Sequence, residues 1–178
     1  VDPVNAPTVE MSAPVLDGGS ILIEWRYLAE GSDLNEFRIT KTVSNETVEV
    51  GRQAAQPEAA WQSASIRDSV LVADIEVTYR VTSLLTGGAE STSASGKIRI
   101  EGPKLAVSVD PVSLMAVLSW SEPIPGTAGY EIVRKGDSTA ETVYSTDDGA
   151  AGNYADPIPE DGKEYVYELT TVLENGIR

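Results

Sequence analysis

Apolar and polar residues alternate over short stretches of this chain, and the clearest alternation lies near its C-terminal end. Residues 165–173 place Tyr165 and Tyr167 at alternate positions, with valine, threonine and leucine among the other residues. A period of two in such residues is typical of a strand with one face on a core. Turn dipeptides flank the stretch, Asp-Gly at 161–162 and Asn-Gly at 175–176. The pattern predicts a β-strand here.

The same period of two recurs through the first hundred residues, whereas helical periodicity is absent. The segment 51–60 predicts a loop with room for one helical turn before Pro57. Short strands with turns every 8–12 residues indicate a β-sandwich of about 100 residues. The expected strands are residues 8–11, 20–26, 36–42, 47–50, one within 61–72, 77–84 and 93–100.

A second unit then repeats the first. Residues 114–120 match residues 20–25 and also end on a tryptophan, so that Trp25 and Trp120 stand 95 positions apart. A repeat of that length is one sandwich domain, which predicts an all-β chain of two tandem immunoglobulin-like sandwiches. The expected division is a linker at 1–7, a first sandwich at 8–101 and a second at 102–178.

Two features resemble the fibronectin type III family. Each tryptophan ends its strand after apolar residues two and four positions earlier, and the next strand carries an aromatic and an aliphatic residue at alternate positions. The residues that carry this resemblance are Ile21, Ile23 and Trp25 with Phe37 and Ile39, then Ala116, Leu118 and Trp120 with Tyr130 and Ile132.

A tyrosine that bonds back across a corner of the sandwich is a third family feature. The resemblance places it at the start of the sixth strand, where the second unit has Tyr165. The first unit has Val77 there, and Tyr79 is its nearest tyrosine. The core residues expected on this basis are Trp25, Trp120, Tyr79, Tyr165 and Tyr167.

Tyr154-x-Asp156, followed by Gly162 and the two later tyrosines, resembles bacterial and phage members of the family. The family mostly supplies spacers, adhesion surfaces and docking sites. The resemblance implies a structural and protein-interaction segment of a larger extracellular, cell-surface or virion (phage tail) protein. Its partners would be other domains of that protein or neighbouring subunits. The alternative is an adhesion module that binds carbohydrate or a receptor.

Composition and charge limit the classes of function that we expect for this chain. The chain has no histidine and no cysteine, which removes the commonest general base, metal ligand and nucleophile pairs. We therefore expect no enzyme, no catalytic residue, no metal and no cofactor. The formal net charge is −15, and such a surface repels phosphate backbones and anionic lipid. We therefore expect that the chain neither binds nucleic acid nor inserts into a membrane.

Two sets of residues are candidates for surface contacts. Leu22, Met115 and Val117 fall on the strand faces opposite the tryptophans, where they serve either strand propensity or a contact surface. Trp61 and Tyr154 either pack within the sandwich or stand exposed and stack on sugar rings. The alternation leaves both readings open.

The second unit is shorter than the first. A seventh strand, the counterpart of residues 93–100, is missing from the pattern before residue 178. A sandwich without that strand exposes backbone donors and acceptors on the neighbouring strand. We expect the strand to come from residues beyond 178 or from another polypeptide by strand addition.

Overall fold

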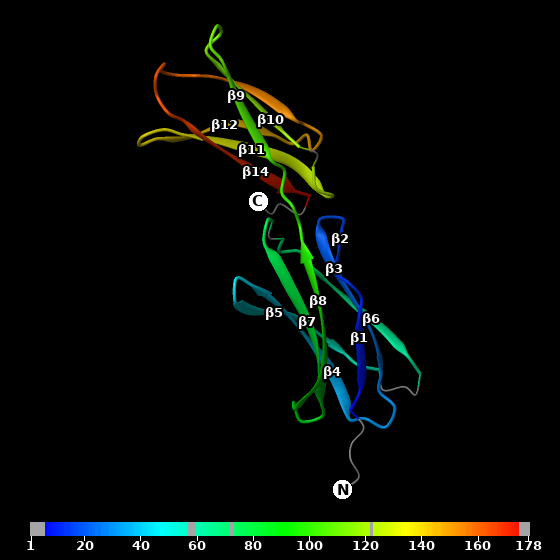
Figure 1. Ribbon diagram of the computed structural model, residues 1–178. Helices are drawn as coiled ribbons and strands as arrows, with labels where there is room; N and C mark the ends of the chain where they lie inside the picture. Colours follow the sequence, from blue (N-terminus) through cyan, green and yellow to red (C-terminus); the bar gives the residue numbers. More distant parts are fainter. Residues whose placement is uncertain (1–5, 57–59, 72, 122, 175–178) are drawn as a thin grey trace. The chain divides into compact units, whose positions relative to one another are not determined.

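The computed structural model describes residues 6–56, 60–71, 73–121 and 123–174. Within these ranges every regular element is a β-strand (Figure 1). The chain divides into two compact units, 1–100 and 101–178. The prediction of an all-β fold built from β-sandwiches is confirmed.

The first unit contains two sheets. In one, β3 pairs with β1 and then β2 on one edge and with β6 on the other; in the second sheet the order is β5-β4-β7-β8 (Figure 1). All these pairings are antiparallel. The strands are β1 (Thr8–Met11), β2 (Val15–Asp17), β3 (Ser20–Leu28), β4 (Leu34–Val43), β5 (Glu46–Ala54), β6 (Gln62–Asp68), β7 (Glu76–Leu85) and β8 (Glu90–Arg99).

Alternation along β3 and β4 builds the core of the first unit. Ile23 and Trp25 of β3 are buried, as are Phe37 and Ile39 of β4. The ring centroids of Trp25 and Phe37 lie 5.5 Å apart in an edge-to-face arrangement, which aromatic pairs favour. The aromatic residue of the third expected strand therefore packs directly on the tryptophan of the second.

In the described part of the second unit there are two three-stranded sheets, of order β13-β10-β9 and β12-β11-β14. Its core cluster is Leu118, Trp120, Tyr130 and Ile132. Among the described residues, no strand pairs with the second edge of β14, where β8 pairs with β7 in the first unit. The strands are β9 (Leu105–Asp110), β10 (Met115–Trp120), β11 (Thr127–Lys135), β12 (Ala140–Thr146), β13 (Asn153–Pro157) and β14 (Val166–Leu173).

Two local expectations were wrong. The loop expected at 51–60 begins later, because β5 continues to Ala54 past a register shift opposite Ile39 and Thr40. Both faces of β5 are largely exposed, so its polar sequence lacks the alternation that predicts a strand. Residues 57–59 of that loop lie outside the described residues. Leu114 belongs to a turn rather than to β10 and has a φ of 54°.

The two tryptophans generate a stability prediction. Trp25→Ala and Trp120→Ala should each lower the free energy of unfolding of their own unit by about 3–5 kcal/mol, because each empties an aromatic core site. Chemical denaturation followed through amide signals of each unit measures this. Trp61→Ala, at an exposed ring, is the control and should cost less than about 1 kcal/mol. A loss that small for either core variant would contradict the packing described above.

Candidate functional site

A buried carboxylate joins the two sheets of the first unit. Asp68 ends β6, and its Oδ2 accepts hydrogen bonds from Lys41 Nζ at 2.6 Å and from Tyr79 Oη at 2.7 Å. Its Oδ1 accepts the backbone N–H of Val70 at 3.0 Å. Lys41, Asp68 and Tyr79 are all buried, and Lys41 also donates to the carbonyl of Val70. The ion pair is therefore fully hydrogen-bonded, the condition under which a buried pair is tolerated.

The second unit contains the same arrangement with arginine in place of lysine. Asp156 of β13 is only 3% exposed. Its Oδ2 accepts a hydrogen bond from Arg134 Nη1 at 2.5 Å and another from Tyr167 Oη at 2.8 Å. The guanidinium also donates to the carbonyl of Pro157 and to Glu141.

Strand register shows that the two clusters are equivalent. Asp68 pairs with Ile21 and Asp156 pairs with Ala116. Ile21 and Ala116 each lie four residues before the core tryptophan of their strand. In the facing sheet, Lys41 pairs across strands with Tyr79, and Arg134 pairs with Tyr167. Each aspartate thus reaches from one sheet to a cation and a tyrosine on the other, so each cluster links the two sheets of its unit.

This register corrects the expected corner tyrosine. Tyr165 precedes β14, is only half-buried and lies beneath the guanidinium of Arg134, 5.7 Å from ring centroid to Cζ. The hydroxyl that bonds across the sandwich belongs to Tyr167 in the second unit and to Tyr79 in the first. The reason is the register of β14 against β11, since Tyr167 is the residue that pairs across strands with the inward cation Arg134.

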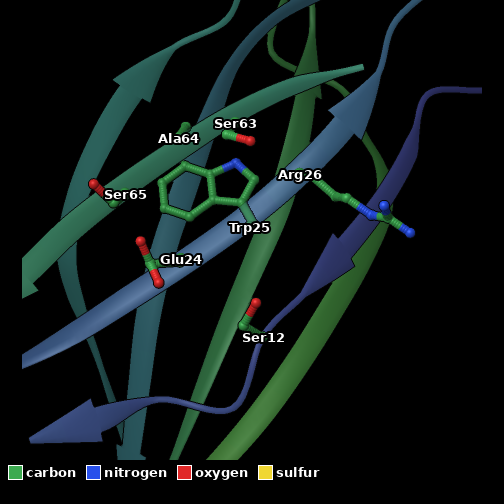
Figure 2. A pocket seen from close by; sticks show the side chains of 7 residues that line it. All are labelled: Ser12, Glu24, Trp25, Arg26, Ser63, Ala64 and Ser65. Atoms are coloured by element: carbon green, nitrogen blue, oxygen red, sulfur yellow. The ribbon is translucent and has the colours of Figure 1, made fainter.

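The outer face of the first unit carries a groove of about 290 Å³. It forms where the chain leaves the edge of β3 between β1 and β2. Figure 2 shows Glu24, Trp25 and Arg26 of β3 next to Ser63, Ala64 and Ser65 of the neighbouring β6, with Ser12 on the other side. The Trp25 ring itself belongs to the core, so the groove presents mainly hydroxyl and charged groups.

Trp61 contacts Arg26, one of the residues that line this groove, and is 45% exposed. The guanidinium of Arg26 lies over its ring, 4.7 Å from the centroid, while it also pairs with Glu10 at 2.5 Å. Tyr154, the other aromatic candidate, is half-buried and stacks on Tyr144 with ring centroids 4.5 Å apart. The structure therefore brings only Trp61 to an exposed polar surface.

The remaining candidates belong to both units, Leu22 to β3 of the first and Met115 and Val117 to β10 of the second. Val117 is 42% exposed on the outer face of β10, whereas Met115 and Leu22 are half-buried. Among the described residues, no three acidic side chains are grouped so that they could hold a metal ion. The same part of the chain contains no helix long and apolar enough to cross a membrane.

Among the described residues, the second unit is open on one side. Val107 and Val109 of β9 are 47% and 59% exposed, although their strand partners Leu118 and Ala116 point into the core. A cavity of about 110 Å³ lies against them and is also lined by Tyr165 and Tyr167. We call this region, together with the unpaired edge of β14, the open side.

The tyrosine clusters predict a loss of stability in alkali. Burial, and then the hydrogen bond to the Asp156 carboxylate, raise the pKa of Tyr167 from 10.0 to about 12. The raised pKa stabilises the folded state fully below about pH 10, and this contribution disappears as the pH rises to about 12, because the unfolded state releases its proton first. Urea unfolding of the second unit between pH 9 and 12, measured by NMR, should show this fall.

Tyr167→Phe should flatten that dependence in the second unit. It should leave the pH dependence of the first unit unchanged, because burial and Asp68 raise the pKa of Tyr79 independently. Tyr79→Phe is the matched variant and should do the reverse. An unchanged pH profile in both variants would show that neither tyrosine is coupled to folding.

Comparison with known proteins gives only structural likenesses. No protein-family model matches the chain, and the comparison with curated proteins found no match. A two-domain fibronectin type III segment from chicken tenascin is 18% identical, covering 95% of this chain and 92% of that chain, with a TM-score of 0.41. The FN1-FN3 domains of chicken CNTN1 are 14% identical over 98% of this chain and 61% of that chain, with a TM-score of 0.36. A cytokine receptor complex is 11% identical over 93% and 91%, with a TM-score of 0.37.

Proposed function

We propose that the chain is a non-catalytic structural and protein-interaction segment of a larger extracellular, cell-surface or virion protein. The observation that carries the proposal is the distribution of exposed apolar side chains. Most of those in the second unit gather on the hairpin formed by β9 and β10. Exposed apolar groups on one short segment indicate a contact surface. The hairpin residues are Val107 and Val109 on the inner face of the sheet, Val112 and Leu114 in the connecting turn, and Val117 on the outer face.

The use of charge inside both units supports the same proposal. Asp68 and Asp156 are the buried carboxylates among the described residues, and each is bound to a cation and a tyrosine. A catalytic carboxylate needs access to substrate and a free acid or base position. These two instead hold one sheet to the other, as a structural module requires.

The inference that the chain belongs to a larger exposed protein rests on the sequence resemblance. Tyr154-x-Asp156 followed by Gly162, Tyr165 and Tyr167 resembles bacterial and phage fibronectin type III modules, which occur beside catalytic, adhesive or tail domains of exposed proteins. Other domains of the same protein, or neighbouring subunits, are the partners that such a setting supplies. An acidic surface is compatible with this role because it keeps an exposed segment soluble.

Hydroxyl-radical footprinting tests this function in the source organism. Labelling of Val112, Leu114 and Val117 should fall severalfold in intact cells or virions relative to the purified chain, because a neighbouring domain or subunit covers the hairpin. Val15 and Val48 are exposed valines of the first unit and serve as matched controls that keep their labelling. Equal labelling of the hairpin in both samples would contradict the proposal.

The exposed Trp61 favours carbohydrate binding as a second candidate function. An aromatic ring next to a groove lined by serine hydroxyls, Glu24 and Arg26 offers both stacking and hydrogen bonding to a sugar, the combination that small-ligand sites use. The Arg26 guanidinium covers part of the ring, so a sugar would have to use the remaining surface.

A glycan array followed by calorimetry decides between the two functions. If the groove binds carbohydrate, Trp61→Ala should abolish binding, while Val48→Ala, at another exposed position, should leave it unchanged. The same samples are assayed for released reducing ends, and the proposed non-catalytic role predicts none. If the wild-type chain binds no glycan on the array, the carbohydrate-binding function is contradicted. Glycan cleavage would contradict the non-catalytic role.

A further inference from the structure

The turn that joins β9 to β10 is built differently from its counterpart in the first unit. Its residues are 111–114, Pro-Val-Ser-Leu, and all four are exposed. In the first unit two glycines, Gly18 and Gly19, join β2 to β3. Gly19 and Leu114 occupy the same position, because each lies six residues before the tryptophan of its strand. The second unit therefore has a leucine where the first has a glycine.

The backbone at this position favours glycine in both units. The φ of Gly19 is 78° and the φ of Leu114 is 54°. Glycine adopts a positive φ without cost, whereas the Cβ of a leucine comes too close to a carbonyl oxygen there. The first unit shows that the fold can make this connection with glycine. A strained residue in a connection that does not require it indicates a role outside folding.

The turn also adds little to the core of the second unit. Val112 is 92% exposed and Leu114 is 44% exposed. Apolar side chains stabilise a fold through the area that they remove from water, and Val112 removes almost none. The glycines of the first unit have no side chain at all. The second unit thus carries an apolar projection that the first unit folds without.

Hydrogen bonds hold this projection in one conformation. Asp110 Oδ1 accepts the backbone N–H of Val112 at 3.0 Å, and Asp110 Oδ2 accepts the hydroxyl of Ser113 at 2.5 Å. The carbonyl of Leu114 accepts the backbone N–H of Ile158 at 3.0 Å. A projection that is already ordered loses little conformational entropy when it binds, which favours association.

The segments on both sides of the turn are acidic. Asp110 precedes it, and Glu160 and Asp161 lie exposed just beyond Ile158, which binds the turn. The lysine of the same segment, Lys163, is already paired with a carboxylate at 3.7 Å. An apolar projection between acidic groups is complementary to an apolar pocket with basic groups at its rim. A second copy of this acidic unit does not fit that description.

We propose that the turn at 111–114 is the anchor of the contact surface, and that it inserts Val112 and Leu114 into an apolar pocket of a partner domain with basic groups at its rim. Burial of the two side chains in the pocket removes their apolar area from water and stabilises the complex. The leucine is retained at a strained position because the contact needs its side chain. This inference rests on the proposed interaction function and names the anchor residues and the chemistry of the partner.

Val112→Ser tests the anchor without disturbing the fold. Because Val112 is almost fully exposed, the melting temperature of the purified chain should stay within about 3 °C of the wild type. In intact cells or virions of the source organism, hydroxyl-radical labelling of Leu114 should rise severalfold, to the level of the purified chain. Val48→Ser, at an exposed valine of β5, is the matched control and should leave the labelling of Leu114 low.

Charge reversal tests the chemistry of the pocket. Glu160→Lys combined with Asp161→Lys should also raise the labelling of Leu114 in intact cells or virions, because like charges then face each other across the contact. Glu46→Lys, at an exposed position of the first unit, is the control and should have no effect.

Two variants of Leu114 test whether the leucine is held at a cost. Leu114→Gly and Leu114→Ala both remove the projecting side chain, but only glycine relieves the positive φ. In the purified chain, the second unit of Leu114→Gly should melt about 3–6 °C above that of Leu114→Ala. Both variants should raise the labelling of Val112 in intact cells or virions.

The proposal is overturned if Val112→Ser leaves Leu114 protected, if the charge-reversed pair does so, or if Leu114→Ala melts as high as Leu114→Gly. Protection of Leu114 that appears in the purified chain as its concentration rises would identify a second copy as the occupant, which also overturns it. The proposed interaction function fails by a different result, equal labelling of the wild-type hairpin in the purified chain and in the intact sample.

Discussion

Each unit depends on one buried carboxylate that is held by the opposite sheet. Asp68 and Asp156 would be expensive to bury alone, because an isolated charge loses its hydration. Each becomes acceptable only when the cation and the tyrosine of the facing strands reach it. Hydrophobic packing around Trp25 and Trp120 is non-directional, whereas these bonds exist in one register of one sheet against the other. The hydrophobic core holds the two sheets of each unit together, whereas the hydrogen bonds of the carboxylate favour one alignment of the sheets.

The strands could be predicted because most of them bury one face. β3, β4 and β10 alternate between buried and more exposed positions, and their sequences show this as apolar residues at every second position. β5 could not be predicted to its full length, because neither of its faces is buried along most of the strand. The sequence pattern also predicted that no strand before residue 178 would pair with the second edge of β14. The exposure of Val107 and Val109 was not predicted, because it depends on which strand of the facing sheet lies above them.

The aspartate clusters were missed although the sequence contains a signal for them. Phe37-x-Ile39 continues to Lys41, and Tyr130-x-Ile132 continues to Arg134. In both strands the inward alternation thus ends on a cation, and an inward cation requires a carboxylate nearby. The choice of Tyr167 over Tyr165 was harder, since both share one face of the strand. Only the pairing of Tyr167 with Arg134 places a hydroxyl next to the aspartate.

The open side also bears on how copies of the chain can assemble. An exposed strand edge can accept a strand of a neighbouring copy, and a contact of that kind, made in one direction only, would join each copy to the next. Such contacts produce rings when the rotation closes and filaments when it does not. The excess of acidic groups on the second unit opposes that polymerisation. Acidic groups on the second unit therefore disfavour any contact that brings two copies of this unit face to face.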